Sequence, residues 1–299
     1  MAHYAFQQHS ALLSMGLNKL DLAEWIEPDE RLAHQSALKQ ALWQKEGERV
    51  FKALPESRSA QAEVADLLRV HLAEHFPHWY EQSPNGLHCL PMTQSFDWAD
   101  SATPLLPASW CVQEDLCILQ EEGGDYRLTA ASLCAPSYWR LLDKIGKPLD
   151  AIHKPVPGFA EQLSGKVNRF FQFIKVDRPV WRANWSVVSD DRLYQPGGEE
   201  ATPIEDPERI ETSCFLRTER QTLRRLPNTG AVLFTIKVTL EPLSDLSSKP
   251  GVLASLADAL GQLSEDEKRY KSLHHLEPAL TTWLSTQTAT QQAARGVEQ

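Results

Sequence analysis

Two long β-prone runs joined by a short turn constrain the fold of this chain more than any other feature. The runs are TSCFLRTERQTLRRLP and GAVLFTIKVTLEPL, and the letters PNTG join them. Proline, asparagine and glycine favour a tight turn, and the flanking residues favour strands. We therefore expect a long antiparallel hairpin, which has to lie within a larger sheet.

The first run of this hairpin carries many charges. Because alternate residues of a strand share a face, the sequence separates two sets. Arg217, Glu219 and Gln221 fall on one side, and the other side holds Leu216, Thr218, Arg220 and Thr222. Charges inside a sheet are costly unless they are paired or bound to a ligand. Glu219 is thus a candidate for binding a cationic group, and carboxylates are candidate ligands of Arg217, Arg220, Arg224 and Arg225. The alternative is an edge strand that charge protects from aggregation.

The remaining segments predict an α+β fold. Residues 28–80 show apolar spacings of three and four, typical of helices, with a break at Pro55. WCVQEDLCIL and EEGGDYRLTAASLCAP predict a hairpin around Gly-Gly, and VWRANWSVVS predicts another strand. EQLSGKVNRFFQFIKV and the region after Pro250 predict helices, followed by a polar tail that we expect to fray. No alternating βα rhythm indicates a Rossmann sheet.

These patterns suggest three consecutive parts. Residues 1–84 form a helical segment that packs on the core, 85–245 form the core with the antiparallel sheet, and 246–299 contribute helices and the polar tail. The antiparallel sheet is thus flanked by helical segments at both ends of the chain.

Charge and composition narrow the classes of function. The formal net charge of -10 disfavours binding to nucleic acid, which requires a basic face. No apolar run is long enough to span a membrane, and the first residues do not resemble a signal peptide. Five cysteines without a CxxC pair indicate a reduced, cytoplasmic protein without a zinc site. The phosphate-binding motifs GxGxxG and GxxxxGK[ST] are absent, as are the catalytic motifs GxSxG and HExxH.

The stretch KIGKPLDAIHKPVPG places a histidine in a constrained backbone. The segment PSYWRLLDKIG predicts a helix of about two turns from Ser137 to Gly146. Pro148 then predicts the start of a second short helix, and Pro155 predicts its end. His153 then lies in the last helical turn, followed by a rigid segment. Metal and haem ligands need such rigidity. The alternative is a surface histidine at a helix end, where the helix dipole favours its charged form.

The strand RPVWRANW adds Arg182, Asn184 and Trp185, which we expect to form one polar and aromatic face of the strand. Asn184 can donate or accept a hydrogen bond at a ligand, and Arg182 can pair with an anion. An ordinary strand with one solvated face explains the same pattern.

Five motifs in order resemble a known family. They are W-x-x-x-EDL, CAPSYW, KIG-x-PL-x-x-IH-x-PVPG, R-x-NW and LR-x-ERQTL-x-RLP-x-x-G, and the resemblance runs from about Asn18 to Leu243. The chain resembles the haem-dependent oxidative N-demethylase alpha subunit family. This resemblance implies a PAS-like fold that binds haem b. It also implies a monooxygenase that uses O2 to demethylate a small secondary amine such as dimethylamine, with electrons from a separate flavin or iron–sulfur reductase.

The resemblance also implies roles for individual residues. His153 becomes the candidate axial ligand of the haem iron, Cys134 is the runner-up, and His88 ranks third. Glu219 becomes the candidate group that binds a protonated amine, which makes it the catalytic candidate. Candidates for binding the cofactor, with the arginines directed at the haem propionates, are Arg182, Asn184, Arg217, Arg220 and Arg224. Two other functions stay open: a non-catalytic haem or gas sensor, and a haem-free protein that binds a small molecule.

Overall fold

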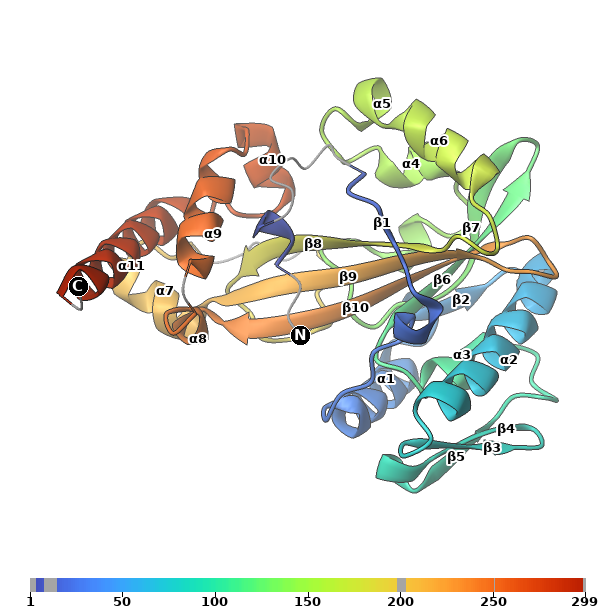
Figure 1. The fold of residues 1–299 in the computed structure, drawn as a ribbon. Coiled ribbons are helices and arrows are strands. Elements are labelled where there is room, and N and C mark those ends of the chain that lie inside the picture. Colours follow the sequence, from blue (N-terminus) through green and yellow to red (C-terminus); the bar gives the residue numbers. More distant parts are fainter. Residues whose placement is uncertain (1–3, 8–14, 198–202, 250, 298–299) are drawn as a thin grey trace.

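A seven-stranded antiparallel sheet forms the centre of the computed structural model (Figure 1). The structure describes residues 4–7, 15–197, 203–249 and 251–297, and for residues 292–297 it describes the backbone alone. The strand order is β1-β8-β9-β10-β6-β7-β2. The strands are β1 (Asn18–Lys19), β2 (Phe51–Ala53), β6 (Asp115–Glu122), β7 (Asp125–Ser132), β8 (Val180–Val188), β9 (Phe215–Arg225) and β10 (Val232–Pro242).

The predicted long hairpin is confirmed as β9 and β10, which pair from Phe215 with Pro242 to Arg225 with Val232. Gly230 adopts a φ of 71°, a left-handed conformation that favours glycine, and so allows the tight turn. The carboxylate of Glu63 accepts hydrogen bonds from the backbone N–H groups of Asn228 and Thr229, at 2.6 and 2.8 Å. The N-terminal part of the chain therefore holds the tip of the hairpin.

Helices cover both faces of the sheet and one of its ends (Figure 1). One face packs on α1 (Leu32–Glu46), α2 (Arg58–His75) and α3 (Leu105–Ser109), and the opposite face packs on α4 (Leu149–His153) and α6 (Ser164–Phe173), with α5 (Phe159–Gln162) next to α6. A third core lies at the end of the sheet and involves α7 (Pro207–Ser213), α8 (Leu243–Leu246), α9 (Val252–Gly261) and α11 (Glu277–Val297), and the short helix α10 (Glu265–Tyr270) lies between α9 and α11 in the chain. The α+β prediction is confirmed.

The N-terminal part differs from a purely helical segment. Its short strands β1 and β2 form the two edges of the main sheet, where they pair with β8 and β7. A separate three-stranded sheet follows, made of β3 (Tyr80–Ser83), β4 (Gly86–Cys89) and β5 (Gln94–Asp97). The predicted division at residues 84 and 245 stays a prediction, and the sheet draws strands from both sides of residue 84.

The predicted helix from Ser137 to Gly146 is wrong. Only the 3-10 turn η6 (Leu141–Asp143) forms there, and Tyr138 has a φ of 59°, which is incompatible with a helix. The Gly146 N–H donates to the Leu128 carbonyl at 2.7 Å, so the end of this segment pairs with the edge of β7 instead of forming a helix. Ser137 does not cap a helix, because its hydroxyl bonds to side chains of β9.

The other helix predictions agree with the structure. Pro148 precedes α4, and α4 ends at His153, before Pro155. The expectation that the polar tail frays is wrong as far as Val297, because α11 continues to that residue. Among the described helices, none has the length and apolar character needed to cross a membrane.

Candidate functional site: a polar cluster on the central sheet

Glu219 lies at the centre of a polar cluster on the face of β8 and β9. Strand pairing places Asn184 opposite Glu219 and Arg182 opposite Gln221. The expectation that Trp185 shares this face is wrong, because Trp185 lies opposite Thr218 and packs in the core at the end of the sheet. The Glu219 side chain is buried, and its Oε2 accepts hydrogen bonds from Gln221 Nε2 at 2.7 Å and Asn184 Nδ2 at 3.5 Å. The Ser137 hydroxyl donates to its Oε1. These donors hold the carboxylate in one orientation, with its charge compensated by hydrogen bonds.

Arg217 connects this carboxylate to two loops. Its side chain is 1% exposed, Nε donates to Ser137 Oγ at 2.9 Å, and Nη2 donates to the Ala135 carbonyl at 2.8 Å and the Leu193 carbonyl at 3.2 Å. Burial lowers the pKa of Arg217, and the nearby Glu219 carboxylate opposes this change. Its Nη1 is buried and has no acceptor in the described part of the chain.

Arg182 supplies a second incompletely satisfied guanidinium. Its Nε is also buried without an acceptor among the described residues. Burial lowers the pKa of Arg182, while Glu219 and Tyr270 favour its charged form. A buried N–H group without an acceptor costs free energy, and an anionic ligand would satisfy it. Arg182 and Arg217 together therefore make the cluster suitable for carboxylates.

The C-terminal segment closes the cluster with two residues that the sequence analysis missed. Lys271 is buried, and its Nζ donates to Asn184 Oδ1 at 3.0 Å and to the Trp185 carbonyl at 2.5 Å. Burial lowers the pKa of Lys271 to about 8, although Glu219 favours the charged form. Tyr270 keeps 41% of its surface exposed, yet burial of its hydroxyl raises its pKa to about 12.

His153 lies at the end of α4, where its ring is close enough to Arg182 for the two to interact electrostatically. Its Nδ1 lies 2.8 Å from the Leu149 carbonyl oxygen, and its ring stacks on Phe159 with centroids 4.5 Å apart. A carbonyl only accepts hydrogen bonds, so Nδ1 carries the proton and Nε2 keeps a free lone pair. Burial lowers the pKa of His153, and the charge of Arg182 lowers it further. The ring is therefore neutral and oriented, as a metal ligand has to be.

The other two candidate ligands lie elsewhere. Cys134 packs with Leu42 and Val50, and burial raises the pKa of its thiol to about 12, which disfavours the thiolate that binds metals. His88 lies on β4 of the small sheet, where its Nδ1 is 3.0 Å from Ser95 Oγ. Neither residue joins the cluster around Glu219.

Arg220 and Arg224 lie on the opposite face of β9. Arg220 donates to the carbonyls of Glu24 and Trp25, at 2.5 and 3.3 Å, and its Nε lies 3.1 Å from a carboxylate oxygen of Glu27. The Arg224 guanidinium stacks over the Trp25 ring at 4.5 Å. The structure therefore brings Arg182, Asn184, Arg217 and Glu219 together, with His153 within electrostatic range of Arg182, and it separates Arg220 and Arg224 from them.

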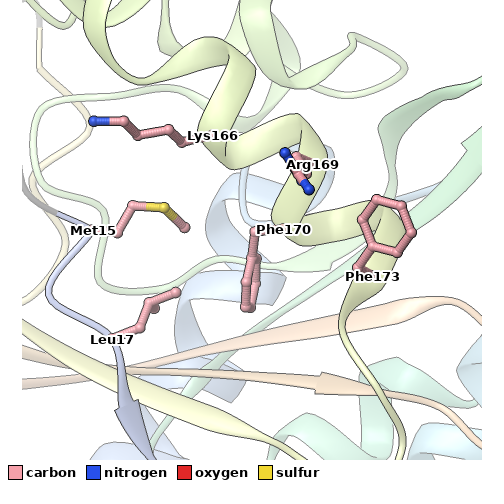
Figure 2. A pocket seen from close by; sticks show the side chains of 6 residues that line it. All are labelled: Met15, Leu17, Lys166, Arg169, Phe170 and Phe173. Carbon is pink, nitrogen blue, oxygen red and sulfur yellow. The ribbon is translucent and has the colours of Figure 1, made fainter.

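A groove lies between α6 and the segment that precedes β1 (Figure 2). It is a shallow groove of about 500 Å³, lined by Met15, Leu17, Lys166, Arg169, Phe170 and Phe173. Its lining is mostly apolar and contains none of the predicted site residues. The groove is nevertheless a neighbour of the His153 helix, because Ser164 and Asn168 of α6 donate to Asp150 of α4.

The candidate site thus combines a neutral histidine at the end of α4 with cationic and anionic side chains on an antiparallel sheet. The model of the family described as "haem-dependent oxidative N-demethylase, alpha subunit-like" matches residues 16–281, and the chain belongs to this family. The matched residues include the whole cluster, from Ser137 to Lys271. The name of the family indicates an oxidative, haem-dependent N-demethylase-like function for a subunit that works with others.

Proposed function

We propose that this chain is the haem-binding oxygenase subunit of an enzyme that removes a methyl group from a small secondary amine, such as dimethylamine. The observation that carries the proposal is the orientation of His153. Its Nδ1–H is bound to the Leu149 carbonyl, which leaves Nε2 as the ligand nitrogen. The family match supports the same conclusion independently.

The side chains at the candidate site suit the iron and the propionates of haem b. Nε2 of His153 would bind the iron, and the unsatisfied N–H groups of Arg182 and Arg217 would bind the propionates, with Asn184 beside them. All five cysteines are free and buried, and none belongs to a CxxCH motif for covalent attachment. We regard the antiparallel sheet with α4–α6 on one face as a PAS-like core for this cofactor.

Haem bound here would supply the activation of O2. The chain itself would bind the amine through Glu219, whose carboxylate Ser137, Gln221 and Asn184 hold in place. A fixed carboxylate orients a protonated amine by charge pairing and proximity. Arg182, Arg217 and Lys271 would repel an ammonium group, so we expect amine binding to need the propionates, which neutralise the two arginines.

We further propose that the electrons come from a separate flavin or iron–sulfur reductase, in keeping with the alpha-subunit name of the family. We place the protein in the cytoplasm, because its five cysteines are all unpaired. Neither proposal depends on the identity of the amine.

Glu219→Gln is expected to weaken binding of dimethylammonium to the haem-loaded chain by roughly 10- to 100-fold, because a hydrogen bond to a charged group is lost. Haem content should stay unchanged, since Glu219 is not the iron ligand. Calorimetric titration with dimethylammonium chloride measures the affinity, and absorbance of the haem measures the loading.

The matched control for Glu219→Gln is Glu241→Gln, which removes the same charge at the C-terminal end of β10, where Glu241 pairs with Lys249 and Tyr4. This control should bind the amine normally. If Glu219→Gln also binds it normally, Glu219 does not belong to the amine site.

A further inference from the structure

Lys271 comes from a part of the chain that reads as an ordinary surface helix, yet it is among the most buried charged residues of the cluster. Only 6% of the residue is exposed, and α10, which it follows, begins with a capping box at Ser264 and Glu267. The Ser186 hydroxyl donates to the Lys271 carbonyl at 2.9 Å, which fastens its backbone to β8. Ser272 then takes a φ of 55°, so the chain turns away directly after Lys271. The segment that follows α10 thus places the ammonium group of Lys271 against β8.

Burial of an ammonium group costs more free energy than burial of a hydrophobic side chain, so a buried lysine indicates a specific role. The contact of Lys271 Nζ with Asn184 indicates what that role is. A side-chain amide has an acceptor end and a donor end, and it can rotate to exchange them. Lys271 only donates, and its 3.0 Å contact selects Oδ1. The Nδ2 end must then face Glu219 Oε2, where it is observed at 3.5 Å.

We infer that Lys271 is a positioning residue of the Glu219 site: it fixes the Asn184 amide so that its N–H2 group orients the carboxylate. The inference deepens the proposed function and rests on it for the identity of the ligand. It also makes the C-terminal segment part of the site, since the cluster is incomplete without Lys271 and its neighbour Tyr270.

Several charged groups act on the Lys271 ammonium. Glu219 and Glu267 stabilise the charged form, Arg182 opposes it, and burial favours the neutral form, which lowers the pKa of Lys271 to about 8. Above that pH the neutral amine can also accept hydrogen bonds, and its hold on Asn184 Oδ1 weakens. The Asn184 amide should therefore report the titration of Lys271.

The test follows the side-chain amide of Asn184 by NMR in the full-length chain. The sequence has five asparagines, so labelling with 15N-asparagine gives a simple spectrum, and an Asn184→Ser variant assigns the signal. The reduced, carbon monoxide-bound form keeps any bound haem diamagnetic. In the wild type we expect the Asn184 signals to shift with a midpoint near pH 8. Lys271→Met should remove this shift, and Lys268→Met, which disrupts surface ion pairs of the same helix, should keep it.

Amine binding gives the second readout. Lys271→Met should weaken dimethylammonium binding by less than roughly 10-fold, because the loss of the orienting hydrogen bond is partly offset by the removal of one charge that repels the ammonium group, while haem loading stays normal. Asn184 signals that have the same positions in the wild type and in Lys271→Met at every pH overturn the inference. Absence of amine binding in the wild type contradicts the proposed function instead, and it leaves the NMR result to decide the role of Lys271.

Discussion

His153→Ala is expected to remove haem from the purified protein. The variant loses the nitrogen that would bind the iron, and neither Cys134 nor His88 lies at the candidate site to replace it. Because loss of a group that only orients a metal ligand weakens binding 10- to 100-fold, we expect the loss of the ligand itself to cost on the order of 100-fold or more. Absorbance in the Soret region, relative to protein after gel filtration, measures the retained haem.

Two controls separate ligation from folding. Cys134→Ala and His88→Ala should keep the wild-type haem content and spectrum, since both side chains lie away from the cluster. Circular dichroism and the Tm of His153→Ala show whether the loss of its stacking on Phe159 has unfolded the protein. A folded His153→Ala variant with full haem loading and an unchanged Soret band would mean that another residue binds the iron.

Arg217→Met is expected to lower the free energy of unfolding by about 3 to 5 kcal/mol. Removal of one member of a buried charge network leaves its partners uncompensated, and that cost is typical of such sites. Here the abandoned partners are the carbonyls of Ala135, Pro136 and Leu193, together with the hydroxyl of Ser137. Urea denaturation at pH 7, followed by fluorescence, measures the change.

The matched control for Arg217→Met is Arg269→Met. Arg269 is exposed and pairs with Asp266 one helical turn away, so its removal should change the stability by no more than about 0.5 kcal/mol. If Arg217→Met is equally harmless, the network around Ser137 and Glu219 contributes little to the fold.

Local signals were sufficient to predict most of the fold. The PNTG turn and the Gly-Gly turn specify two hairpins, because few other sequences allow the left-handed backbone of Gly123, Gly124 and Gly230. The short strand Phe51–Ala53 escaped prediction because three residues carry no measurable period. The segment after Ser137 was misassigned because its partners, Leu128 and Arg217, are distant in sequence, and such contacts outweigh a local capping preference.

The site was only partly predictable for the same reason. The alternation of β9 already separated Arg217 and Glu219 from Arg220, and the structure confirms that separation and places Arg224 with Arg220. The sequence does not show that Glu24 and Trp25 approach from the far face. Lys271 lies in the charged stretch EDEKRYK, which resembles a solvated helix, so no local signal indicates its burial. The motif CAPSYW contains Ser137, so the sequence offered a signal that could have identified Ser137 as a site residue.

The central claim is that the chain binds haem through His153. The most direct measurement is the absorption spectrum of protein expressed with a haem precursor, recorded before and after addition of dithionite and carbon monoxide. Our account predicts a Soret band that shifts, with carbon monoxide, to the position typical of histidine-ligated haem. A thiolate-type carbon monoxide peak would contradict the assignment of His153. No Soret band, even with excess haem, would contradict haem binding by this chain and with it the proposed function.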